Sequence, residues 1–248
     1  MIVEDPLKMI VYSPPGHGKT TLLGTAAGDP RLSPMLLIEF EGGTRSIRSK
    51  VKKISIDQLG KEKPKVDVIH TVEIRTWGDF DLVYDFLLTA DHPYRSIGLD
   101  SLSEMNYLNM QTVLLDAGIQ DKNRDLDIPE QRDYLKSASQ MRRLVRYFRD
   151  LPMHVFMTSG AQQGQDPRTK TSMMMMSLTG KLVFEIPGLF DVVGYLAMVD
   201  QEDGATERWL FTQPTGRFDA KDRTEGGKLG EYIVNPTLPK ILDLVEGK

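Results

Sequence analysis

The fold is decided by the stretch Lys8–Leu22, which reads KMIVYSPPGHGKTTL. Its first five residues form a short apolar run, typical of a buried strand, and Thr20–Ala27 has helical character. Between the two lies a loop rich in glycine and proline. Such a turn from strand to helix gathers backbone N–H groups in one concavity, where they can bind the many oxygens of a phosphate chain. The stretch therefore predicts a phosphate-binding loop that follows a buried strand.

The side chains of this loop support the same chemistry. Lys19 supplies a mobile positive charge for the β- and γ-phosphates, and the Thr20 hydroxyl can coordinate Mg²⁺. The pattern is the P-loop G-x-x-x-x-G-K-[ST], except that Ser13 replaces the usual first glycine, so the start of the turn must accommodate a Cβ atom. A chance Gly-rich loop would not need to lie between a strand and a helix. We predict that ATP and Mg²⁺ bind here. The predicted nucleotide-binding residues are Ser13, Pro14, Pro15, Gly16, His17, Gly18, Lys19, Thr20 and Thr21.

Outward from the loop, short apolar runs alternate with helical segments. Met35–Phe40, Ile97–Leu99 and His154–Thr158 are apolar on both faces, which indicates a parallel sheet covered on both sides. The last third of the chain is richer in strand-like segments. We therefore expect an α/β fold with a mainly parallel central sheet flanked by helices and a β-rich C-terminal part. The expected helices are Phe80–Ala90, Leu102–Ala117, Leu135–Phe148 and Leu238–Glu246, and the expected late strands are Asp191–Val199 and Arg208–Gln213.

Length and composition limit the kind of protein. A chain of 248 residues suits one large α/β domain and is short for two, so we expect a single domain over 1–248. Hydrophobic residues at 40% and charged residues at 27% are typical of a globular protein. The N-terminus lacks a basic segment followed by an apolar core, so we expect no secretory signal, no membrane partner and a cytoplasmic location. The chain has no cysteine and only four histidines without ligand spacing, so any metal should arrive with the nucleotide.

Positive charge gathers between Arg45 and Lys65. The net charge of the chain is −4, but this segment holds eight basic residues against two acidic ones, Asp57 and Glu62. Charge acts locally, so the segment is a candidate surface for a polyanion. The alternative is a solvated loop or a sheet edge protected by lysines. The basic residues are Arg45, Arg48, Lys50, Lys52, Lys53, Lys61, Lys63 and Lys65.

Carboxylates after two other apolar runs complete a predicted site for ATP hydrolysis. Asp100 ends the run Ser96–Asp100, and the Mg²⁺ side of a P-loop requires a carboxylate at the end of a neighbouring strand. A helix N-cap role for Asp100 is compatible with metal binding. Hydrolysis also requires a carboxylate that polarises the attacking water, and we select Glu41, at the end of MLLIEFEGG. Glu39 faces the same way two residues earlier and is the rival base, and a purely structural Glu41 is the further alternative.

With these motifs the chain resembles the RecA-like core ATPases, and most closely a phage-encoded group of compact RecA-like proteins associated with single-strand annealing and recombination. The resemblance covers nearly the whole chain, through YSPPGHGKTTL, LLIEFEGGT, IGLDSLSEM, FDVVGYL and RFDAKDRTEGG. It implies that Glu41 is the hydrolytic base and that Thr158 and Ser159 sense the γ-phosphate. Gln162 is a rival sensor, because RecA proteins use an amide in that role. For a phage-encoded protein, the location would be the cytoplasm of the host bacterium.

The segment Ala220–Arg223 resembles the K-x-R motif that RecA-like proteins and hexameric helicases point into the ATP site of a neighbouring subunit. Lys221 and Arg223 lie two residues apart on an extended chain, so they face the same way and can both reach a γ-phosphate. The alternative is an ordinary exposed loop. The resemblance implies a homo-oligomer, either a ring or a filament, whose shared ATP site uses Lys221 and Arg223 as catalytic residues beside Lys19.

The segment Gly160–Lys181 is too long for an ordinary connection, so we expect it to be functional or mobile. RecA-like recombinases carry a DNA-contacting loop here, and Arg168 and Lys170 are candidates for binding the phosphates of single-stranded DNA. Met173–Met176 can lie against splayed bases or pack into a neighbouring protomer. The stretch 162–179 has no aromatic residue for base stacking.

Two functions follow from these motifs. The first is an ATP-dependent, single-strand-binding ATPase of recombination or annealing. The rival is an ATP-dependent loader or adaptor for a replicative helicase or another replication protein, and single-strand-binding proteins are further candidate partners. A small-molecule kinase would share the P-loop but would not explain Glu41-Gly42-Gly43 or Lys221-Asp222-Arg223.

Overall fold

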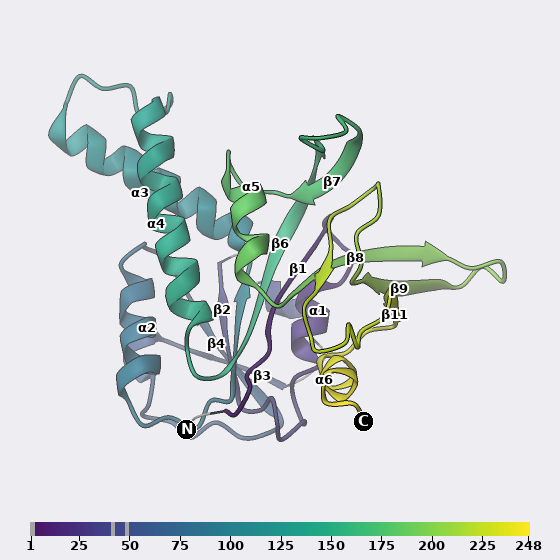
Figure 1. Cartoon of the computed structure of the whole chain (residues 1–248). Coiled ribbons are helices and arrows are strands. Elements are labelled where there is room, and N and C mark those ends of the chain that lie inside the picture. Colours follow the sequence, from purple (N-terminus) through teal and green to yellow (C-terminus); the bar gives the residue numbers. More distant parts are fainter. Residues whose placement is uncertain (1–2, 41–42, 48–49) are drawn as a thin grey trace.

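The computed structural model describes residues 3–40, 43–47 and 50–248 (Figure 1). The strands are β1 (Lys8–Ser13), β2 (Met35–Glu39), β3 (Lys50–Ile54), β4 (Val68–Glu73), β5 (Ser96–Asp100), β6 (His154–Gln165), β7 (Ser172–Met176), β8 (Val192–Asp200), β9 (Thr206–Phe211), β10 (Lys221–Asp222) and β11 (Tyr232–Val234). The α-helices are α1 (Lys19–Gly24), α2 (Asp79–Thr89), α3 (Leu102–Gln120), α4 (Gln131–Arg149), α5 (Leu182–Glu185) and α6 (Leu238–Glu246). Short 3₁₀ helices cover Gly43–Ser46, Ile56–Gln58 and Pro187–Leu189.

The described strands form one sheet in the order β11-β9-β8-β1-β6-β5-β2-β4-β3. From β8 to β3 every neighbouring pair is parallel, so the carboxyl ends of β1, β6, β5 and β2 lie at one edge. Strands β9 and β11 extend the sheet in antiparallel fashion, β10 pairs with the start of β8, and β7 pairs with the end of β6. The expected α/β class, with a mainly parallel sheet and a β-rich C-terminal part, is confirmed.

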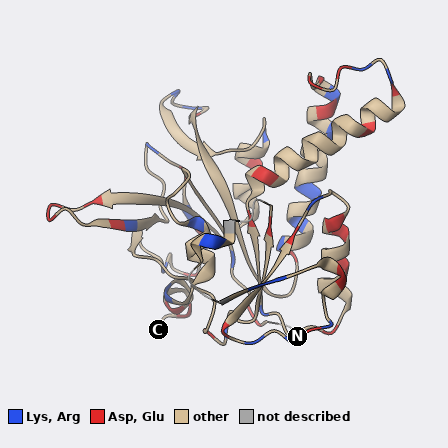
Figure 2. Ribbon diagram, turned by 180° about the vertical axis from the view of Figure 1, so that it is seen from behind, with Lys and Arg blue, Asp and Glu red and all other residues tan. Residues whose placement is uncertain are grey.

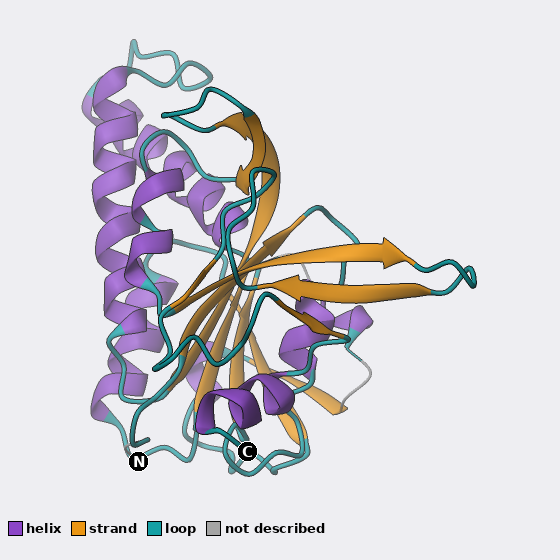
Figure 3. Ribbon diagram, turned by 45° about the vertical axis from the view of Figure 1, so that its right-hand side comes forward, coloured by secondary structure: helices purple, strands orange, loops and turns teal. Residues whose placement is uncertain are grey.

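Helices cover both faces of the sheet (Figure 3). On one face, α2 and α4 contribute Phe80 and Phe148 to one core cluster, and on the other face α1 contributes Leu23 to a second. Strand β1 supplies both clusters in alternation, with Ile10 in the first and Val11 in the second. This double burial explains why the parallel strands are apolar on both faces. No helix in the described part of the chain combines the length and apolar character needed to cross a bilayer.

The largest departure from the expected elements concerns β6. A strand was expected over His154–Thr158, but β6 continues to Gln165 and returns as β7, so the long connection is mainly a β-hairpin that rises beyond the sheet (Figure 1). The first half of β6 is buried and the second half is largely exposed. The exposed half therefore lacks the apolar residues by which a buried strand is recognised.

Strands β3 and β4 were also not expected. Strand β3 lies at the end of the sheet, inside the basic segment, and the side chains of Lys52 and Lys53 are 51% and 60% exposed. This arrangement fits the alternative in which lysines protect a sheet edge from further pairing.

Candidate nucleotide-binding site

The loop between β1 and α1 has the backbone that its glycines predict. Gly16 and Gly18 have φ values of 80° and 98°, in the left-handed region that glycine adopts without a steric penalty. Gly18 is the N-cap of α1, so the free N–H groups of the first turn lie beside the loop. Ser13 is fully buried at the end of β1, and its hydroxyl donates a 3.0 Å hydrogen bond to Pro14 O. The residue that replaces the usual first glycine is thus accommodated as part of a strand.

The Lys19 ammonium folds back over the loop. Its Nζ donates to Ser13 O at 2.9 Å and to Ser13 Oγ and Pro14 O at 3.2 Å each. Burial lowers the pKa of Lys19, and the nearby Asp100 carboxylate opposes that change. Phosphate oxygens can replace these carbonyls, because an anion accepts stronger hydrogen bonds from an ammonium than a neutral carbonyl does.

The two predicted metal ligands meet at the carboxyl edge of the sheet. Thr20 Oγ1 donates to Asp100 Oδ2 at 2.5 Å, and the Thr158 hydroxyl donates to Asp100 Oδ1. The strand order explains this meeting, because β6 lies between β1 and β5 and all three strands run in the same direction. The Asp100–Ser101 peptide bond is cis. One of the predicted sensor residues, Thr158, therefore contacts the predicted metal ligand directly.

A cavity of about 450 Å³ opens beside these groups. Lys19, Thr20 and Asp100 line it, together with Ser103 and Glu104, which the sequence analysis did not select. Both new residues lie in the first turn of α3, directly after the strand that ends in Asp100. This proximity to Asp100 in the sequence could have identified them as candidates. The other lining residues are Pro15, Gly16, Leu37, Glu39, Thr44, Ser101, Gly160, Ala161 and Ser177.

None of the three sensor candidates is among the residues that line this cavity. Ser159 is fully buried, and its Oγ lies 3.2 Å from Ser103 Oγ, so it is linked to the cavity through that residue. Gln162 is exposed, and its amide donates to Leu178 O at 3.3 Å. Of the three candidates, Thr158 has the most direct link to the predicted metal ligands.

The predicted base, Glu41, lies outside the described residues. Its rival Glu39 ends β2, is only 3% exposed and lines the cavity. Lys53 Nζ lies 3.2 Å from Glu39 Oε1, an ion pair without hydrogen-bond geometry, and no described residue forms a hydrogen bond with Oε2. A buried carboxylate with a free oxygen at the cavity can accept a proton from water, so Glu39 remains a candidate base.

The sequence profile of a family described as "AAA domain" matches residues 5–224. The chain belongs to this AAA-domain family. Its family membership makes it an AAA-type P-loop ATPase. In three dimensions the AAA-domain chain is similar to a KaiC-like protein of the hyperthermophilic archaeon Pyrococcus horikoshii, with a TM-score of 0.47 and 12% sequence identity, over 92% of this chain and 88% of that chain. No curated protein matches the sequence significantly.

The residues of the AAA-domain site fit a nucleotide with Mg²⁺. Thr20 and Asp100 supply two hard oxygen ligands at one point, and Lys19 and the loop N–H groups can bind phosphates. The described residues contain no group of three or more His, Asp or Glu side chains that could hold a metal. A magnesium ion at this site would therefore take its other ligands from phosphate oxygens and water, as Mg²⁺ commonly does.

Lys221 and Arg223 lie toward the opposite edge of the sheet from the loop. Lys221 belongs to β10, which pairs with the start of β8. The Arg223 N–H donates to Asp191 O, and the Asp191 N–H donates to Lys8 O, at the beginning of β1. From there to Ser13 the strand advances by five residues, roughly 17 Å at about 3.3 Å each. Neither cation lines the phosphate cavity of its own chain, and the ATP site shared with a second protomer stays a prediction.

Two β-hairpins of the AAA-domain chain project with opposite charge at their tips (Figure 2). The turn between β6 and β7 carries exposed Arg168 and Lys170 and is ordered by Asp166, whose carboxylate accepts backbone N–H groups of the turn. The turn between β8 and β9 carries Glu202 and Asp203. The phosphates of a nucleic acid would be attracted to the first tip and repelled by the second.

Proposed function

We propose that this AAA-type P-loop ATPase hydrolyses ATP and binds single-stranded DNA under the control of ATP, as a homo-oligomer that acts in recombination or strand annealing. The observation that carries the proposal is the position of the β6–β7 hairpin. Gly160, Ala161 and Ser177 at its base line the phosphate cavity, and Arg168 and Lys170 are exposed at its tip. A nucleotide in the cavity would therefore contact the same hairpin that meets DNA.

In the proposed reaction, Lys19 and the loop N–H groups bind the phosphates, and Thr20 and Asp100 would hold Mg²⁺. The metal ion would neutralise charge on the phosphate oxygens. The carboxylate of Glu41 accepts a proton from water while the water oxygen forms a bond to the γ-phosphorus. The bond from that phosphorus to the β–γ bridging oxygen breaks, which yields ADP and inorganic phosphate. Lys221 and Arg223 of a neighbouring protomer offset the charge that develops on the transferred group.

The binding of a fluorescently labelled oligothymidylate tests the proposal, with anisotropy measured with ATP, with ADP and without nucleotide. We expect the tightest binding with ATP. Arg168→Ala combined with Lys170→Ala should lower the affinity and reduce the slope of log K against log salt by about 1.4, since each phosphate contact on a single strand contributes about 0.7.

The matched control is Arg132→Ala combined with Lys136→Ala, which removes two exposed cations from α4. This control should leave both the affinity and the salt slope close to the wild-type values. Equal affinity in all three nucleotide states, or a hairpin variant that binds like the control, would contradict the proposal.

A second candidate function is a loader or adaptor that places a replication protein on DNA. The observation that favours it is the far end of the α3–α4 pair, where Leu115, Ile119, Ile128 and Leu135 are 59%, 80%, 65% and 65% exposed. Apolar side chains gathered on a surface are typical of a protein contact. ATP hydrolysis without measurable affinity for the oligonucleotide would favour this second function over the first.

A further inference from the structure

A second cavity, of about 330 Å³, lies on the other side of the P-loop residues. Gly18 and Thr21 of the loop line this second cavity. Lys19 and Thr20, which lie between these two residues in the sequence, line the phosphate cavity. The γ-phosphate of a nucleotide would lie beside Lys19, Thr20 and Asp100. The α-phosphate and the nucleoside would then lie farther along the loop, away from these three residues. The remaining lining residues of the second cavity are Leu22, Thr25, Leu196, Arg208, Asn235, Pro236 and Thr237.

We propose that this second cavity binds the nucleoside of ATP and that Arg208 is the residue that positions it. The inference rests on the proposed function, because it assumes that a nucleotide occupies the P-loop, and it adds the part of the site that selects the base. The volume is suited to a nucleoside, since pockets for small molecules are commonly about 300–1,000 Å³.

The walls of the cavity suit a flat, partly apolar ring. Leu22, Leu196 and Pro236 are buried and form its apolar part. The hydroxyls of Thr25 and Thr237 already accept the N–H groups of Leu238 and Lys240. The polar groups left for a ligand are therefore few, which is typical of a pocket that fixes the orientation of a ring.

Arg208 packs directly on the P-loop. A Cβ atom built on Gly18 would lie 2.6 Å from Arg208 Nε, so only a glycine leaves room for this side chain in its present position. The backbone of Arg208 is held by Asn235, with the Arg208 N–H donating to Asn235 Oδ1 at 3.2 Å and the Asn235 N–H donating to Arg208 O at 2.6 Å. No ion pair joins the guanidinium to another described residue. A planar cation in this position can lie over a base and donate to an acceptor on the nucleotide.

The donors of the cavity favour adenine over guanine. Asn235 Oδ1 is already used by Arg208, so the Asn235 amide N–H groups and the Arg208 guanidinium can bind a base only as donors, and the Thr21 hydroxyl is a further polar side-chain group of the lining. Adenine offers ring nitrogens that accept hydrogen bonds and has one donor group, the N6 amine. Guanine also presents donors at N1 and N2, and no carboxylate occurs among the described residues that line this cavity. Burying those guanine donors without acceptors would weaken binding.

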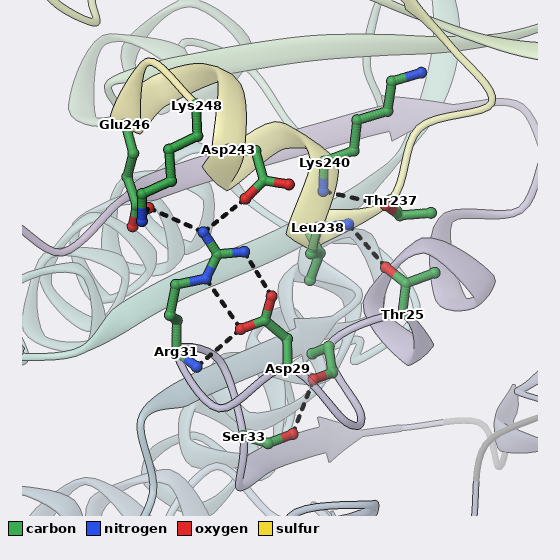
Figure 4. A network of polar contacts seen from close by, with 11 residues as sticks. Thr25, Asp29, Arg31, Ser33, Thr237, Leu238, Lys240, Asp243, Glu246 and Lys248 are labelled. Carbon is green, nitrogen blue, oxygen red and sulfur yellow. Dashed lines mark hydrogen bonds and ion pairs between the residues drawn. The ribbon is translucent and has the colours of Figure 1, made fainter.

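The wall that carries Asn235, Pro236 and Thr237 is anchored by one hydrogen bond to the end of α1 and by two ion pairs to Arg31 (Figure 4). Leu238 at the start of α6 donates its N–H to Thr25 Oγ1 at 2.8 Å. Near the end of α6, Asp243 and Glu246 form ion pairs of 2.7 and 2.9 Å with Arg31. The cavity is therefore bounded by elements that hold each other in place, which is what a preformed pocket requires.

Isothermal titration calorimetry with ATP, GTP and inorganic tripolyphosphate tests this inference. In Arg208→Ala we expect ATP to bind about tenfold more weakly, as for the loss of one charge-assisted contact, and tripolyphosphate to bind as in the wild type. The matched control is Arg217→Ala, which removes another exposed arginine outside the cavity and should change neither ligand. ATP binding by Arg208→Ala at the wild-type affinity, or equal losses for ATP and tripolyphosphate, would overturn the assignment.

The same titrations separate this inference from the function on which it rests. A wild-type protein that binds neither ATP nor tripolyphosphate contradicts the nucleotide site itself. A protein that binds both ligands with equal affinity, and whose Arg208→Ala variant is unchanged, retains the phosphate site and contradicts only the nucleoside cavity.

A second variant tests the choice of base without removing a contact to the backbone. Asn235 has a φ of 47°, which aspartate also tolerates, so Asn235→Asp keeps the acceptor for the Arg208 N–H and exchanges the amide donors for an acceptor. The ratio of the Kd for GTP to the Kd for ATP should fall by about tenfold. A folded Asn235→Asp protein with the wild-type ratio would show that Asn235 does not recognise the base.

Discussion

The Thr20 hydroxyl donates a 2.5 Å hydrogen bond to Asp100 Oδ2, although the two residues are 80 positions apart in the sequence. The contact joins the first turn of α1 to the end of β5 across the intervening β6. A hydroxyl and a carboxylate from separate elements thus meet at the edge where the P-loop lies. On this basis we propose that Thr20 and Asp100 are the Mg²⁺ ligands.

Asp100→Asn should weaken ATP binding in the presence of Mg²⁺ by roughly tenfold or more, because the amide removes the negative charge that attracts the ion. Binding in EDTA should change much less. The measurement is calorimetric titration of ATP with Mg²⁺ and with EDTA. Asp116→Asn, at an exposed carboxylate of α3, is the control. If Asp100→Asn retains the wild-type difference between the two conditions, Asp100 is not a metal ligand.

Glu41→Gln should keep ATP binding but lower the rate of hydrolysis by about 10²–10⁴, because an amide cannot accept the proton of the attacking water. Glu39→Gln provides the comparison, since Glu39 lines the same cavity. The measurement is phosphate release at saturating ATP for both variants. Normal turnover by Glu41→Gln together with loss in Glu39→Gln would move the base to Glu39.

Arg223→Ala should reduce hydrolysis by about 10³ or more, as for other arginines that act from a neighbouring subunit, and should leave ATP binding by the monomer nearly unchanged. Mixing Arg223→Ala with Lys19→Ala protein should restore part of the activity, because some interfaces then pair an intact loop with an intact Arg223. The phosphate-release rate should also rise with protein concentration. Activity independent of concentration, with no recovery on mixing, would leave Lys221 and Arg223 as part of a surface loop.

The local chemistry of the site was predictable from the sequence, and its long-range contacts were not. Lys19 and Thr20 are consecutive residues of one sequence motif. Asp100 ends an apolar run, and the carboxyl end of such a strand lies at the same edge of a parallel sheet as the loop. Arg208, by contrast, touches Gly18 from an exposed hairpin 190 residues away, and no spacing in the sequence indicates that contact.

The hairpin of β6 and β7 shows a second limit. The rule that recognises strands depends on burial, and β6 leaves the core midway, so its exposed half has no apolar pattern. Its Met173–Met176 stretch was singled out in the sequence, and two of these residues, Met175 and Met176, are now found buried in the core of the same chain. The sequence alone had suggested contacts of this run with DNA or with a neighbouring protomer.

Stability should depend on pH through His154, which is 4% exposed and accepts the Leu7 N–H at Nδ1. Burial, assisted by the Lys8 ammonium, lowers the pKa of His154 to about 4. The unfolded histidine titrates near 6.5, so the unfolded chain binds an additional proton as the pH falls below that value. The folded state should therefore lose roughly 2.5 kcal/mol between pH 7 and pH 4.5 through this group.

His154→Gln keeps an acceptor for Leu7 and removes the titration, so it should lose correspondingly less stability over the same interval. Denaturant unfolding of both proteins at the two pH values measures the difference. Equal losses would show that His154 does not titrate as its burial requires.

The rate of Mg²⁺-dependent phosphate release from ATP, compared between the wild type and Lys19→Ala, tests the nucleotide site most directly. Lys19 contacts only the loop carbonyls and the Ser13 hydroxyl through Nζ in the described structure, so its truncation should leave the fold intact, as circular dichroism can verify. We predict that the wild type releases phosphate and that Lys19→Ala neither releases it nor binds ATP tightly. A folded Lys19→Ala protein that hydrolyses ATP at the wild-type rate would contradict the assignment of the site.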